Sequence, residues 1–267
     1  MSMTRPSHWR YRLVIIGLWV SALFAEAQVA VYLKGIDEPK RGDTLRYVAS
    51  SKNYILIVGG VQLALPFESV ERVEIPKPAA MIEAEKMVTD GRLTSAIPIL
   101  EELAVDFAVL QWGPKAEALL ADAYAKAGHH AKALTTYSEL FKKTPAGDVP
   151  FQTRQNYWAA MLGGQRLDAL VVELLNAVDH GPRVEAAHAQ VMLGDVRRAQ
   201  NKTQDAFLEY LRASLLFEDV GDVQPEALFK AAEMLDVLRD PRAGDLRKRV
   251  VQKYPASEYA RKVGVSM

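Results

Sequence analysis

The sequence contains no cysteine among its 267 residues. This absence excludes disulfide bonds, thiolate zinc sites, a cysteine nucleophile and a cysteine for lipid attachment. The sequence also lacks a surplus of either charge, because 33 basic and 33 acidic residues give a formal net charge of zero. Proteins that bind nucleic acids normally carry a basic surplus that neutralises phosphates. We therefore expect no nucleic-acid partner.

Motifs that indicate catalysis are missing as well. The sequence has no glycine-rich phosphate loop followed by lysine and serine or threonine, no His-Glu-x-x-His and no Gly-x-Ser-x-Gly. The adjacent His129 and His130 have no carboxylate or thiol at ligand spacing, which favours a solvated turn over a metal site. We therefore expect a protein that is not an enzyme, with no catalytic residues, no cofactor and no metal.

Residues 1–27 have the pattern of a signal peptide. Three arginines precede an apolar run over residues 13–25, and Ala25-Glu26-Ala27 is a small-x-small cleavage site. The run is shorter than the roughly 20 residues that span a bilayer. We expect cleavage after Ala27, no stable membrane insertion, and a bacterial protein that is periplasmic or extracellular. An uncleaved membrane anchor is the alternative.

Residues 28–76 show the alternation of short β-strands. Turn signals such as residues 37–42 and Gly59-Gly60 separate the strands. The five predicted strands are residues 29–33, 44–48, 54–58, 61–65 and 70–75. Five strands of this length can close a small barrel, and their layout resembles SH3 or Sm-type barrels in its pattern of strands and turns. No motif here is specific for RNA.

Residues 77–267 have a helical period, which is clearest over residues 114–145. Leu120 and Tyr124 lie on one face of a first helix, and Ala133 and Tyr137 on one face of a second. Gly128 lies between the two segments, where a helix commonly ends. The pattern predicts a helical hairpin, and since one hairpin cannot bury its apolar face, it predicts neighbours of the same kind.

The pattern recurs along the chain. With Ala133 as the marker, the corresponding alanines are Ala96, Ala133, Ala169, Ala206 and Ala243, at spacings of 37, 36, 37 and 37 residues. Five residues before each marker stand Gly91, Gly128, Gly164, Asn201 and Leu238. Glycine and asparagine tolerate the left-handed conformation that ends many helices. The fifth position departs from this pattern, and we expect Asp240-Pro241 to make that turn. The sequence predicts about five hairpins.

The large, small, aromatic, glycine, alanine, aromatic and proline positions of residues 120–145 resemble a tetratricopeptide repeat (TPR). Other α-solenoids are the alternative. The resemblance implies a mainly α fold, a right-handed TPR-like α-solenoid that follows the small five-stranded β-barrel. The C-terminal Tyr-Pro-x-Ser-x-Tyr-Ala of residues 254–260 resembles TPR proteins of the bacterial cell envelope. Another cell-envelope protein is therefore one candidate partner.

The resemblance also implies a site. In TPR proteins the first helix of each hairpin lines a concave groove that binds a protein or peptide segment. The residues expected to face this groove are Lys115, Asp122, Lys126, Arg154, Trp158, Asp195 and Arg198. Trp158 would be the aromatic anchor, unless it belongs to the core.

Two functions follow from these patterns. The first is a non-catalytic periplasmic interaction module or scaffold. The alternative is a structural subunit that self-assembles through the N-terminal barrel and uses the repeats as a spacer, which leaves a homo-oligomer open.

Overall fold

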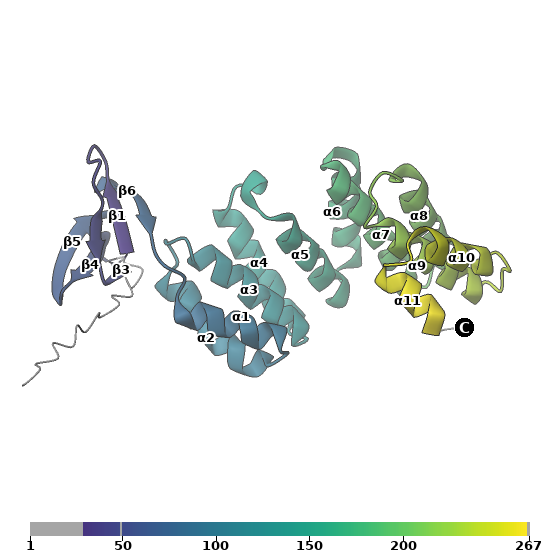
Figure 1. The fold of residues 1–267 in the computed structure, drawn as a ribbon, viewed down its shortest axis with the longest axis horizontal. Helices are drawn as coiled ribbons and strands as arrows, with labels where there is room; N and C mark the ends of the chain where they lie inside the picture. Colours follow the sequence, from purple (N-terminus) through teal and green to yellow (C-terminus); the bar gives the residue numbers. More distant parts are fainter. Residues whose placement is uncertain (1–28, 49, 266–267) are drawn as a thin grey trace, which may run out of the picture.

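The computed structural model describes residues 29–48 and 50–265 (Figure 1). The predicted signal peptide, residues 1–27, lies outside the described residues. A small unit of strands stands at one end, and the helices follow it in a row toward the C-terminus (Figure 1). Over the described ranges, we find no helix with the length and apolar character needed to cross a membrane.

The N-terminal unit contains six strands in two sheets. The strands are β1 (Val29–Leu33), β2 (Lys40–Gly42), β3 (Thr44–Val48), β4 (Asn53–Val58), β5 (Val61–Pro66) and β6 (Val70–Glu74). One antiparallel sheet has the order β2-β1-β6 and the other β3-β4-β5. The prediction of five strands in one barrel is therefore corrected to six strands in two small sheets. Lys40 and Arg41 belong to β2 although they look like part of a turn, because they pair with β1.

One segment of chain connects the two sheets. Gly42 ends β2 and lies against β4, where a Cβ atom would come within 2.6 Å of Leu56 Cδ1. The next residue, Asp43, donates its backbone N–H to the Ile57 carbonyl at 2.7 Å. Only glycine fits this approach, so the sheets can share a core that includes the buried Val31 and Leu56.

The strand unit is held against the end of the first helical hairpin. Leu110, in the connection after the second helix, is 4% exposed and packs in the core of the strand unit. The indole N–H of Trp112 donates to the Ile75 carbonyl at 2.9 Å, and the Gln111 amide donates to the same oxygen at 2.6 Å. The junction is therefore packed and hydrogen-bonded rather than a free linker.

The rest of the described chain is helical. The helices are α1 (Ala79–Thr89), α2 (Leu93–Asp106), α3 (Gly113–Lys126), α4 (His130–Lys143), α5 (Phe151–Gly163), α6 (Leu167–His180), α7 (Arg183–Ala199), α8 (Thr203–Leu216), α9 (Gln224–Val237), α10 (Ala243–Lys253) and α11 (Glu258–Val265). They form five hairpins, α1/α2 to α9/α10, with α11 after the last. This arrangement confirms a mainly helical fold of repeated hairpins.

Each hairpin turn contains a residue in the left-handed conformation. These residues are Gly91, Gly128, Gln165, Asn201 and Arg239, with φ between 56° and 79°. Glycine and asparagine were predicted at three of these positions. In the third hairpin the prediction is one residue early, because Gly164 has a negative φ and Gln165 makes the turn. In the fifth hairpin Arg239, directly before the expected Asp240-Pro241, has the left-handed conformation.

The shift at Gly164 changes the register of the third hairpin. Ala96, Ala133 and Ala206 are fully buried, five residues after their left-handed residues, as expected for packing markers. In the third hairpin the buried residue at this position is Leu170, and Ala169 is exposed. Ala169 is therefore not the marker of the third hairpin. In the fifth hairpin the predicted marker Ala243 is buried, four residues after Arg239.

Replacing Ala133 by leucine is expected to destabilise the array. Ala133 has no exposed surface and packs in the core of the first two hairpins with Tyr137 and Leu120. Three additional carbon atoms would overpack this core, at a cost of about 1–3 kcal/mol in the free energy of unfolding. Chemical denaturation measures the change, and Ala169→Leu at the exposed position is the matched control. Equal stability of the two variants would contradict the register.

Candidate functional site

The first helices of the hairpins, α1, α3, α5, α7 and α9, form a face that we call the A-face. Its N-terminal part contains a hollow of about 450 Å³ between α1, α3, α5 and the connection before α5. The apolar residues that line the hollow are Met81, Pro114, Ala118, Leu119, Leu140, Val149 and Pro150. A hollow of this size can receive one or two large side chains of a partner.

Lys115 and Asp122, two of the residues expected to face a groove, line the hollow. Lys115 is exposed, and its ammonium lies 4.3 Å from the centroid of the Trp112 ring. Among the described residues it has no carboxylate partner, so no carboxylate neutralises its charge. Glu85, on the opposite wall, forms an ion pair with Lys77.

Asp122 is engaged within the protein. Its carboxylate accepts hydrogen bonds from the Tyr137 hydroxyl and, at 2.9 Å, from the Asn156 amide. Burial raises the pKa of Asp122, while these two hydrogen bonds and the nearby Lys126 act in the opposite direction. Asp122 therefore ties α3 to α4 and α5, and Lys126 stays exposed at the end of α3.

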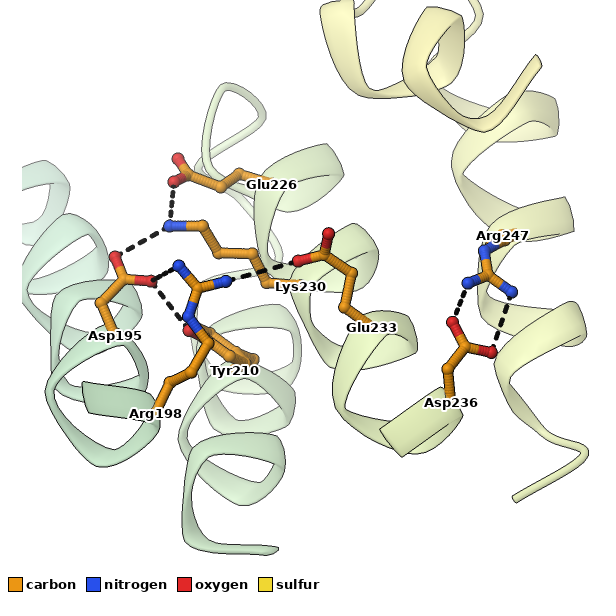
Figure 2. Close-up of polar contacts among 8 residues, drawn as sticks. All are labelled: Asp195, Arg198, Tyr210, Glu226, Lys230, Glu233, Asp236 and Arg247. Atoms are coloured by element: carbon orange, nitrogen blue, oxygen red, sulfur yellow. Dashed lines mark hydrogen bonds and ion pairs between the residues drawn. The ribbon is translucent and has the colours of Figure 1, made fainter. Parts of the chain in front are cut away.

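Asp195 has the same role two hairpins later. It accepts the Tyr210 hydroxyl and the Lys230 ammonium, each at 2.8 Å, and Arg198 lies 4.0 Å away (Figure 2). Asp122 and Asp195 both stand six residues before the left-handed residue of their hairpin. Asn156 and Lys230 stand nine residues before that of the next hairpin. The two aspartates are thus equivalent bridges between consecutive hairpins.

The bridge at Asp195 continues into a charged network. Lys230 also contacts Glu226 at 2.7 Å, and Arg198 contacts Glu233 at 3.6 Å (Figure 2). A second hollow, of about 720 Å³, begins beside this network between α9 and α11, where Phe229 and Tyr259 lie. The C-terminal part of the A-face is therefore charged, whereas the N-terminal part is apolar.

Arg154 is placed between two first helices. Its guanidinium contacts Glu185 of α7 at 2.6 Å, and the Glu185 side chain is buried. Arg154 therefore neutralises a buried carboxylate, which accounts for its position without a ligand.

Trp158 does not face a groove. It is 1% exposed and packs in a core cluster with Leu170 and Leu174, so the expectation of an exposed aromatic anchor is wrong. The cause is the shifted turn. Counted from Gln165, the residue equivalent to Asp122 and Asp195 is the exposed Ala159, one position after Trp158.

In the other hairpins, the position equivalent to Trp158 is occupied by a small residue. The residues seven before the left-handed residue are Ala84, Ala121, Trp158, Gly194 and Ala232, all buried. At Gly194 a Cβ atom would come within 2.3 Å of the Tyr210 ring, so a small residue is required where the second helix carries tyrosine. In the third hairpin Leu174 replaces that tyrosine and leaves space for the indole. In the third hairpin the aromatic residue of this pair is therefore on the first helix, whereas in the neighbouring hairpins it is on the second.

Ala118 and Leu119 in the wall of the hollow were not predicted as site residues. They stand between Lys115 and Asp122 on one stripe of α3, at helical spacing. That spacing was the available signal. Ala118 and Leu119 were missed because only large or charged residues were considered as binding candidates.

The fold and the A-face define a helical-repeat protein with an open face made by its first helices. No protein-family model matches the chain, and no curated protein sequence matches it. Among solved structures it is similar to "MamA 41-end from Desulfovibrio magneticus RS-1", with 16% identity, a TM-score of 0.49, and coverage of 67% of this chain and 95% of that one. It is also similar to the MamA RS-1 ArsTM double mutant, with 16% identity, a TM-score of 0.48 and coverage of 67% and 94%.

Proposed function

We propose that the chain is a non-catalytic, exported interaction scaffold that binds a segment of another cell-envelope protein on its A-face. The observation that carries this proposal is the open apolar hollow between α1, α3 and α5. An apolar concavity of a few hundred Å³ beside a free charge is typical of sites that anchor a partner side chain. Export is supported by the signal-peptide pattern of residues 1–27.

The hollow suggests what the bound segment contains. One or two large apolar side chains would occupy the space between Met81, Leu119 and Val149. Lys115 at the edge would attract an acidic group that flanks them. Trp158 and Arg154 have no part in this proposal, because packing and the ion pair with Glu185 account for them.

Filling the hollow should abolish binding without unfolding the array. Ala118 is half-buried in its wall, so Ala118→Trp would place an indole where the partner side chain enters. We expect loss of the partner recovered from an envelope extract, by a factor of ten or more for about 1.4 kcal/mol of lost affinity. Quantitative mass spectrometry of pull-downs measures this loss.

The matched control is Ala131→Trp, on the exposed surface of α4 outside this hollow. It should keep the partner. Equal recovery with both variants, at unchanged melting temperatures, would place binding elsewhere.

A second candidate function is self-assembly through the strand unit. It is supported by β5, which lies at the edge of its sheet and exposes Val61 (70%) and Leu63 (37%) next to Val58 (44%). An apolar edge strand without charged residues is a template for pairing with another chain. Val61→Lys combined with Leu63→Lys should prevent that pairing, and light scattering would show a lower mass. An unchanged mass would leave the A-face as the functional surface.

A further inference from the structure

The two ends of the helical array carry opposite charge although the whole chain is neutral. Residues 79–109, the first hairpin and the connection after it, contain six acidic and two basic residues, a net charge of −4. Residues 239–265 contain three acidic and eight basic residues, a net charge of +5. Figure 1 shows α1 and α2 at one end of the row of helices and α10 and α11 at the other.

At the first end, two of the six acidic residues, Glu102 and Asp106, form an exposed stripe of α2 that we call the acidic face. Glu102 and Asp106 lie one turn apart, and over the described ranges neither makes an ion pair or a side-chain hydrogen bond. Beside them Val105 is 75% exposed and Val109 is 44% exposed. An apolar strip with unpaired charges along its edge is typical of a contact surface.

At the other end, α10 has a corresponding basic face. Arg249 and Lys253 lie one turn apart, and no ion pair is made by either within the described part of the chain. Lys248 is exposed on the same helix. The neighbouring Arg247 is different, because it is neutralised by Asp236 (Figure 2).

We infer that the acidic face of one copy of this chain binds the basic face of a second copy. The two faces match in charge, and the acidic face adds the exposed Val105 and Val109, which the contact would bury. Exposed ion pairs contribute about 0–1 kcal/mol each, so the valines must supply part of the affinity, and the charges select the orientation. Two acidic faces or two basic faces repel each other, and the contact is therefore head to tail.

A partner that is only anionic would account for the basic face but not for the acidic face. A nucleic acid or an anionic membrane would use the basic face and leave the unpaired Glu102 and Asp106 without a role. A second copy uses both faces. The inference does not rest on the proposed function, because the hollow is lined by α1, α3, α4, α5 and the connections beside them, and contains no residue of either face.

The test uses charge reversal at each end. Glu102→Lys with Asp106→Lys makes the acidic face basic, and Arg249→Glu with Lys253→Glu reverses the two unpaired charges of the basic face. In sedimentation velocity at low salt, we expect the parent chain to self-associate and each variant to lose this association by at least about tenfold. An equimolar mixture of the two variants should associate again, because each face of one variant can then meet a face of opposite charge on the other.

Two controls separate this contact from other effects. Asp179→Lys with Glu218→Lys changes the net charge by the same amount at exposed positions outside both faces, and should leave the association unchanged. Val61→Lys with Leu63→Lys should also leave it unchanged. Salt should weaken the association, since the screening length falls to about 3 Å at 1 M.

A parent chain that stays monomeric at low salt would overturn the inference. So would mixed variants that remain apart. If binding to anionic vesicles depended on Arg249 and Lys253 while the mixture stayed monomeric, the basic face would belong to a membrane contact and the inference would be wrong.

Discussion

Replacing Trp158 by alanine is expected to lower the free energy of unfolding by about 3–5 kcal/mol, the cost of removing a large aromatic side chain from a core. The indole is 1% exposed and fills the third hairpin between Leu170 and Leu174. Its N–H group has no hydrogen-bond partner among the described residues, so the expected loss comes from packing. Chemical denaturation with a two-state fit measures it.

A second substitution tests why a tryptophan is tolerated there. Leu174 stands where the neighbouring hairpins carry Tyr137 and Tyr210, opposite Ala121 and Gly194. Leu174→Tyr alone should overpack the core by about 1–3 kcal/mol. Combined with Trp158→Ala it restores the order of small and large residues found in the neighbours, so the pair should cost less than the sum of the single changes. Additive costs would contradict the exchange of sizes. A loss below about 1 kcal/mol for Trp158→Ala alone would contradict the burial of the indole.

Asp195→Ala is expected to cost about 2–4 kcal/mol, because it removes one partner of a nearly buried ion pair. The Lys230 side chain is 16% exposed and would keep Glu226 as its only carboxylate partner within the described residues. Burial opposes the charge of Lys230, but Asp195 and Glu226 outweigh it and raise the pKa of the ammonium. The Tyr210 hydroxyl, which is buried, would lose its acceptor as well.

The equivalent bridge provides the matched control. Asp122→Ala removes hydrogen bonds to Tyr137 and to the neutral Asn156, so it should cost less, about 1–2 kcal/mol. Thermal and chemical denaturation of the two variants side by side measure the difference. Equal costs would mean that the charge of Lys230 does not depend on Asp195, and would contradict the role of the network in joining the fourth and fifth hairpins.

The candidate site could be predicted in part. Lys115 and Asp122 line the hollow because the helical phase of α3 follows from Gly128, which the sequence marks clearly. Trp158 was misplaced because the choice between Gly164 and Gln165 cannot be made locally. A residue contributes about 100° of rotation to a helix, so an error of one position moves a side chain from the groove to the core.

The sequence by itself determined the change from strands to helices, the number of hairpins and their average period. These features rest on local causes, such as apolar periodicity and the tolerance of glycine and asparagine for left-handed turns. The tertiary structure alone decided that Lys40–Gly42 is a strand, that Gln165 makes the third turn, and that Trp158 is buried. It also decided that Asp195 is a bridge to Lys230 and not a free ligand. The burial of Trp158 and the bond from Lys230 to Asp195 depend on partners in other helices, whose size or charge outweighs the weaker local preference.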